Sequence, residues 1–251
     1  MIKFMHFSGS KNSISKGSGT GYSVPSNGDF VWIFAQNPDE KEIGKIAADF
    51  SIDQRYFRTF SKEHRSVRYS MNPLIFVFMD YYFEGGHIKS SRALFVLKEN
   101  ALIIVMQKAA SFYTELFDRL VDSFKPVKKK SLLRLMYQFL MEDVEVNYDV
   151  LERGEYMIMD LENDIMKGKN GERVDDVIKL KRKIHRMSRR FWGSAKIVFM
   201  IKKGLTPLKL DIENAHLLDD VYNTYMHQID ILSSAKEMLS DVLSIHNTKV
   251  G

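Results

Sequence analysis

The stretch HLLDDVYNTYMHQIDILSSAKEMLSD, residues 216–241, decides how the fold of this chain is interpreted. No glycine or proline interrupts it, so it predicts one long helix. Polar residues recur along it at steps of three and four, which places them on one face, here called the polar seam: His216, Asp220, Asn223, His227, Asp230, Ser234, Glu237 and Asp241. A second face is apolar and is called the apolar seam: Leu218, Val221, Tyr225, Leu232, Leu239 and Val242. We expect the apolar seam to pack on other helices.

Two further long helices precede this one, and no convincing strand lies among them. The first is expected from about 131 to 166 and the second from about 172 to 203, with the turn KGKNG between them. The third is expected from about 207 to 250. At about 1.5 Å per residue it would be roughly 60 Å long, which is more than this helical half can cover on all sides. We therefore expect another copy of the chain to pack against it.

The first half of the chain alternates strand-like and helix-like segments. The predicted fold class is therefore an α/β or α+β domain with a mixed sheet over residues 1–125, followed by a helical domain over 126–251. DFVWIFAQ (29–36) predicts a central strand, and PLIFVFMDYYF (73–83) and RALFVLKENALIIVMQ (92–107) predict three more. A helix is expected after Asn37, with Pro38 in first position and Glu40 completing a capping box. Residues 9–21, rich in glycine and serine, predict a loop.

The composition excludes several classes of protein. The 251 residues contain no cysteine, so disulfides, zinc–thiolate sites and thiol nucleophiles are absent. No apolar run reaches the roughly 18 residues of a membrane span, so we expect the chain as given to be soluble. Its histidines form no metalloprotease motif, and nothing marks a nucleophile and its base. We therefore expect no enzyme.

One basic stretch leaves an alternative open. KLKRKIHRMSRR, residues 179–190, is dense in cations, and the chain carries a net charge of +5. A nucleic-acid-binding protein would use such a stretch, but no recognition module accompanies it. The simpler interpretation is the charged face of a coiled-coil helix beside an acidic neighbour. We expect no nucleic-acid partner, and a scaffold without an ion-binding role remains the other alternative.

Four segments in combination resemble the CorA family of magnesium and cobalt channels. They are FVWI before a helix that starts with Asn-Pro, the hairpin FVLKENALIIV before a helix, LKRKIHRMSRRFW, and LDDVYNTYMHQID at residues 218–230. The resemblance covers the chain from about residue 29 onward. It implies an N-terminal α/β domain, two long "willow" helices and a stalk helix that continues into the membrane. It also implies five subunits around one pore.

The resemblance further implies a regulatory site for divalent cations between neighbouring cytoplasmic domains. Asp220 matches the stalk-helix aspartate that helps to bind this ion. Oxygen and imidazole ligands suit Mg²⁺ and Co²⁺, and the expected metal ligands are His216, Asp219, Asp220, Asn223, His227 and Asp230. The acidic partner on the neighbouring domain falls near Thr59, which is a poor ligand. Asp53, Glu63 or His64 would have to replace it.

The sequence also departs from the family pattern. The Gly-Met-Asn selectivity motif and both membrane spans are missing. We therefore expect the chain to be the ion-sensing and gating part of a longer channel, lying at the cytoplasmic face of the cell membrane. Bound divalent cations would hold the full-length pentamer closed. Membrane contact is expected only through the missing C-terminal spans.

Overall fold

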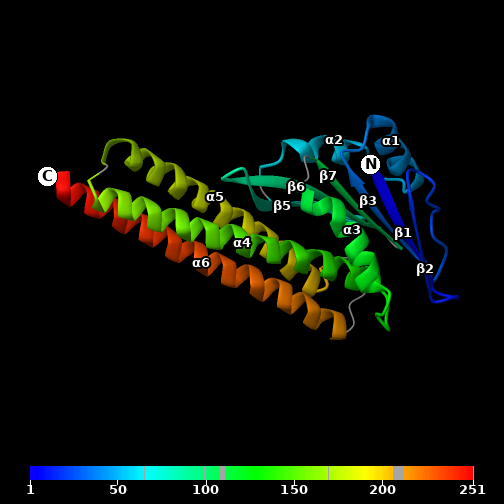
Figure 1. The fold of residues 1–251 in the computed structure, drawn as a ribbon. Helices are drawn as coiled ribbons and strands as arrows, with labels where there is room; N and C mark the ends of the chain where they lie inside the picture. Colours follow the sequence, from blue (N-terminus) through cyan, green and yellow to red (C-terminus); the bar gives the residue numbers. More distant parts are fainter. Residues whose placement is uncertain (65, 99, 108–110, 169, 206–211, 251) are drawn as a thin grey trace.

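The computed structural model describes residues 1–64, 66–98, 100–107, 111–168, 170–205 and 212–250. Within these residues, seven strands form one mixed sheet in the order β2-β1-β3-β7-β6-β5-β4 (Figure 1). The strands are β1 (Ile2–Ser8), β2 (Ser13–Ser18), β3 (Phe30–Gln36), β4 (Val67–Met71), β5 (Leu74–Glu84), β6 (His87–Lys98) and β7 (Ala101–Gln107). β3 and β7 are parallel, and the other neighbouring pairs are antiparallel. The predicted mixed sheet is thereby confirmed.

Helices cover both faces of this sheet. On one face lie α1 (Glu40–Asp49), α2 (Arg55–Thr59) and a short 3-10 turn, η1 (Phe60–Lys62). On the other lie α3 (Ser111–Phe124), α4 (Leu132–Met166), α5 (Asn170–Lys202) and α6 (Ile212–Val250) (Figure 1). β3 shows the result most clearly, because Val31 and Ile33 face the first group while Trp32 and Phe34 face the second. The continuous apolar run of this strand follows from burial on both sides.

Two local predictions are wrong. Residues 13–18 form the edge strand β2, paired with β1 from Ser13 opposite Ser8 to Ser18 opposite Lys3, rather than a loop. The N-cap of α1 is Asp39 and not Asn37. Asp39 accepts from the backbone N–H of Glu42 at 2.8 Å, and the Glu42 carboxylate accepts from the N–H of Asp39 at 3.0 Å. Asn37 has a φ of 45° and turns the chain out of β3, whereas an N-cap residue needs an extended backbone.

The three predicted long helices are present as α4, α5 and α6. α6 packs along both α4 and α5, and every residue of the apolar seam is buried. Tyr225 joins the helices to the sheet, since its ring lies 6.3 Å from Phe78 of β5 and 5.9 Å from Phe191 of α5. One apolar core thus extends from the sheet into the helices, and a domain boundary at residue 126 remains a prediction. Among the described residues, no helix is long and apolar enough to span a bilayer.

Candidate metal centre

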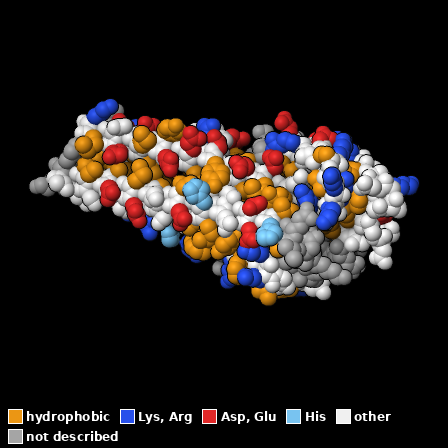
Figure 2. Space-filling view, turned by 90° about the horizontal axis from the view of Figure 1, so that it is seen from below, with side chains coloured by type: hydrophobic (Ala, Val, Ile, Leu, Met, Phe, Trp, Pro, Cys, Tyr) orange, Lys and Arg blue, Asp and Glu red, His pale blue; other side chains and the backbone are white. Residues whose placement is uncertain are grey.

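The polar seam of α6 faces solvent along its whole length. All eight of its residues are exposed. The apolar seam of the same helix is buried and packs in the core. Figure 2 views the molecule from below and shows acidic side chains spread along the long helices, with hydrophobic side chains between them. The seam therefore offers carboxylate, amide and imidazole groups to an ion in solution.

The spacing of the seam limits what one chain can bind. His216 and Asp230 lie about 21 Å apart along the axis, at about 1.5 Å per residue. Since metal–ligand bonds are about 2.0–2.6 Å long, one ion can reach only neighbours on the seam, such as Asp220 with Asn223 or His227 with Asp230. Among the described residues, no group of three or more His, Asp or Glu side chains is placed to hold a metal. Within one chain, the described seam residues thus form pairs of neighbours and no complete ligand set.

Asp220 lies at the edge between α6 and α4. Burial raises the pKa of the Tyr137 hydroxyl on α4 above its ordinary value, and the negative charge of Asp220 raises this pKa further. The Thr224 hydroxyl donates to the Asp220 carbonyl at 2.8 Å, which is a contact within the helix. Because Asp220 is exposed, its carboxylate remains accessible to a hydrated cation.

Asp219 has a different environment from the rest of the candidate ligands. It forms an ion pair with Lys202 of α5 and is only partly exposed. The imidazole Nδ1 of His216 lies 3.9 Å from the second oxygen of Asp219. Lys202 thus competes with a cation for this carboxylate. No pattern in the sequence predicts this pairing, because Lys202 lies on α5 and Asp219 on α6.

Of the residues considered as partners of Asp220, Asp53 and Thr59 lie with α2 on the opposite side of the sheet. His64 lies against α5, where its carbonyl accepts from Arg190. The Thr59 hydroxyl donates to the Arg55 carbonyl of its own helix at 2.9 Å. Asp53 accepts from Arg55, and these hydrogen bonds hold the pKa of its carboxyl below the usual value. His64 has its Nδ1 3.5 Å from a guanidinium nitrogen of Arg92. α2 packs on one face of the sheet and α6 on the other, so Asp220 and the residues of α2 do not meet within one chain.

Comparison with known proteins gives a consistent result. The model of the family described as CorA-like Mg²⁺ transporter protein matches residues 27–251. Among curated proteins, the chain is similar to the cobalt/magnesium transport protein CorA of Thermotoga maritima, with 19% identity over 163 residues. This match covers 65% of the chain and 46% of that protein, so the chain spans about half the length of the curated relative.

Solved structures show the same fold. The complete structure of the CorA magnesium transporter from Methanocaldococcus jannaschii matches with a TM-score of 0.80 and 17% identity, covering 98% of this chain and 76% of that one. The soluble domain of the same CorA matches with a TM-score of 0.74 and 17% identity, over 87% of this chain and 88% of that one. The cytoplasmic domain of ZntB from Vibrio parahaemolyticus gives 0.70 at 12% identity, with coverages of 99% and 98%.

Proposed function

The chain belongs to the family of CorA-like Mg²⁺ transporter proteins, and on this premise we propose that it is the ion-sensing and gating part of a divalent-cation channel. The proposed ions are Mg²⁺ and Co²⁺, and the proposed role involves no enzymatic step. The proposed setting is a homo-pentamer at the cytoplasmic face of a membrane. The main support is the polar seam, whose eight residues are all exposed on a helix whose other side is buried.

In the proposed mechanism, cations bind between copies of the chain. Asp220 approaches the α2 side of a neighbouring copy, and the other proposed ligands are Asn223, His227, Asp230, His216 and, with its carboxylate paired, Asp219. Mg²⁺ keeps several of its waters, so exposed carboxylates can hold it through water. Bound ions would offset repulsion among the carboxylates of adjacent subunits. Linkage then requires that the ions bind the closed assembly more tightly than the open one.

A thermal melt with Mg²⁺ and Co²⁺ tests this proposal. At an ion concentration tenfold above Kd, binding to the native state contributes about 1.4 kcal/mol. For a chain of this size, that raises the melting midpoint by about 3–5 °C. We expect the rise in the wild type and a smaller rise in Asp220→Ala. Glu155→Ala removes an exposed carboxylate from α4, outside the seam, and should behave like the wild type.

Light scattering with and without the ions completes the test. Because the proposed site lies between copies, Mg²⁺ should increase the molar mass of the wild type or hold an existing oligomer together. A chain whose midpoint and mass are both unchanged by Mg²⁺ and Co²⁺ would contradict the ion-sensing role and favour a scaffold. A rise that is equal in Asp220→Ala would move the site away from this residue.

A further inference from the structure

A groove between α5 and β6 is lined mainly by cationic side chains. Its volume is about 370 Å³, and five of its lining residues carry positive charge: Lys89, Lys179, Lys183, Arg186 and Arg190. Among the described residues that line it, none is acidic. We call it the cationic groove. It lies between the surfaces of α5 and β6, and its α5 residues are distinct from Ile184 and Met187, which belong to the core.

The fold brings these cations together from two elements. Lys179, Lys183, Arg186 and Arg190 recur at steps of four, three and four, which puts them on one face of α5. β6 supplies Lys89 from the facing strand. The guanidinium of Arg190 is fixed in place, because its Nε donates to the His64 carbonyl at 3.1 Å and the group lies 5.1 Å from the ring centre of Tyr81.

Carboxylates neutralise only part of this charge. Lys89 forms an ion pair with Glu84 at 2.5 Å, and Lys179 lies 3.4 Å from Asp176. Among the described residues, Lys183, Arg186 and Arg190 form no ion pair with a carboxylate. The expectation that the basic stretch lies against an acidic neighbour therefore fails for these three residues, which face the groove.

The electrostatics of the groove favour an anionic ligand. Burial lowers the pKa of Lys183 below its usual value, and repulsion from Arg186 lowers it further. Burial and the charge of Arg190 likewise lower the pKa of Arg92, beside the groove. Positive charges are thus held close together where they are partly desolvated, and their mutual repulsion raises the free energy of the groove. A bound anion would reduce this repulsion.

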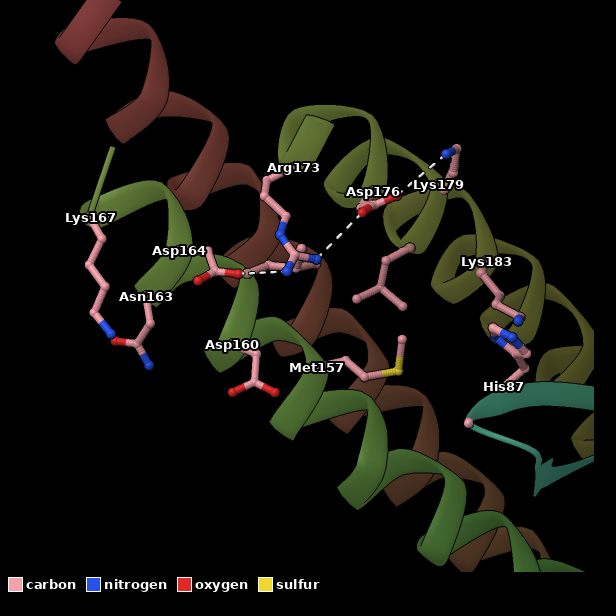
Figure 3. A pocket seen from close by; sticks show the side chains of 13 residues that line it. His87, Met157, Asp160, Asn163, Asp164, Lys167, Arg173, Asp176, Lys179 and Lys183 are labelled. Carbon is pink, nitrogen blue, oxygen red and sulfur yellow. Dashed lines mark hydrogen bonds and ion pairs between the residues drawn. The ribbon is translucent and has the colours of Figure 1, made fainter. Parts of the chain in front are cut away.

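A larger pocket of about 690 Å³ adjoins the cationic groove and shares Lys179 and Lys183 with it (Figure 3). Met157 and Leu161 of α4 contribute apolar surface to it. At its far end Arg173 lies 2.8 Å from Asp164 and 3.7 Å from Asp176, so that cation is already paired. Lys167 also lines this pocket, together with the carboxylates of Asp160, Asp164 and Asp176, whereas no carboxylate of the described residues lines the cationic groove. The excess of positive over negative charge is therefore greatest in the cationic groove.

We propose that the cationic groove binds the phosphate groups of a small molecule that carries two or more phosphates, and that the adjoining pocket receives the rest of the ligand. Lysine and arginine donate charge-assisted hydrogen bonds to phosphate oxygens, and several phosphates match several unpaired cations. A nucleic-acid duplex fits less well, because specific protein–DNA interfaces bury about 1,000–2,500 Å² of protein surface and this groove is concave and small. The proposal does not depend on the ion-sensing role.

Calorimetric titration of the whole chain tests the proposal. It is carried out in low salt and without divalent cations, so that no cation binding at the polar seam contributes heat. The probes are sodium tripolyphosphate, ATP and adenosine, with sulfate at matched ionic strength as a control. We expect tripolyphosphate and ATP to bind and adenosine alone not to bind. Tighter binding of ATP than of tripolyphosphate would indicate that the adjoining pocket takes the nucleoside. Equal binding would support the phosphate site in the groove and would overturn the role of the adjoining pocket.

Two charge-removing variants locate the site. Lys183→Gln with Arg186→Gln should weaken tripolyphosphate binding at least about tenfold, since hydrogen bonds to charged groups are the strong ones. Arg189→Gln removes one positive charge from an exposed position on α5 outside the lining and should bind like the wild type. Melting curves confirm that the variants are folded. Failure of tripolyphosphate and ATP to bind, an equal loss in Arg189→Gln, or much tighter binding of a short RNA or DNA than of either probe would overturn the proposal.

Discussion

Asp118 of α3 binds two lysines that come from neighbouring strands. Lys3 of β1 donates to one carboxylate oxygen at 2.6 Å, and Lys16 of β2 donates to the other at 2.8 Å. These contacts, first that of Lys16 and then that of Lys3, hold the pKa of the Asp118 carboxyl below its ordinary value. One side chain thus ties the edge strand β2 to the helix that covers the sheet.

The pKa of Asp118 predicts an acid-sensitive contribution to stability. Because the folded pKa is depressed, this contribution is complete above the ordinary value of 3.8 and is lost as the pH falls through the lower folded value. Asp118→Asn should lower stability at neutral pH by about 0.5–1 kcal/mol, as expected for exposed ion pairs. It should also flatten the fall of the melting midpoint in acid.

Melting curves from neutral to acidic pH measure both effects. Glu115→Gln is the matched control, because it removes an exposed carboxylate from the same helix. If the acid profile of Asp118→Asn followed that of the wild type, the two lysine contacts would contribute nothing to folding.

At the scale of elements, the sequence correctly predicts the helices and strands whose apolar residues recur with a regular period and are buried. Every residue of the apolar seam is buried, and β3 is the apolar central strand that the sequence predicts. It failed for β2, because an edge strand with the sequence SISKGS pairs through its backbone and needs few apolar side chains. It also failed to find the buried polar residues Asn147 and Gln228, which in a helical pattern look like surface residues.

Asn147, at the contact between α4 and α6, is expected to lower the stability of the fold. Gln228 of α6 donates to the Val144 carbonyl of α4 at 2.7 Å, but among the described residues neither polar atom of the Asn147 side chain has a hydrogen-bond partner. A buried polar group without a partner costs about 1–3 kcal/mol. Asn147→Leu should therefore raise the melting midpoint, by roughly 2–4 °C for each kcal/mol recovered.

Gln228→Leu provides the contrast, because it removes the hydrogen bond that Nε2 makes, although the buried Oε1 of Gln228 has no partner among the described residues. Its midpoint should stay level or fall in the same melting experiment. A fall of the same size in Asn147→Leu would mean that the amide of Asn147 is satisfied in solution.

At the scale of the whole molecule, the shared core predicts one cooperative unfolding transition. Trp32 is fully buried in the sheet, where its ring centre lies 4.7 Å from that of Phe117, and Trp192 is 50% exposed on α5. These are the two tryptophans of the chain, so Trp192→Phe leaves Trp32 as the only one. In this variant, fluorescence follows the sheet while circular dichroism follows mainly the long helices. We expect the two midpoints to coincide.

Separate midpoints would contradict a single cooperative unit and would support domains that divide near residue 126. Coincidence would mean that the sheet and the long helices stabilise each other, as a continuous core requires.

The family was predicted from four short segments, and the family match over residues 27–251 confirms it. The ligand set could not be completed in the same way. The periodicity of the polar seam predicts which residues one chain exposes. The side chains that would face them in an assembly belong to a second copy. Asp220 and the α2 region lie on opposite faces of one sheet, so neither sequence nor fold of a single chain pairs them.

The placement of Asp220 and the α2 region on opposite faces affects how many ions an assembly would bind. If an ion needs one face from each of two copies, ions are bound per contact between subunits and not per subunit. A closed ring has as many head-to-tail contacts as members, whereas an open row has one fewer. For each type of site, the number of ions per chain would then be one in a closed ring and one half in an open pair. Stoichiometry alone would reveal whether the ring is closed.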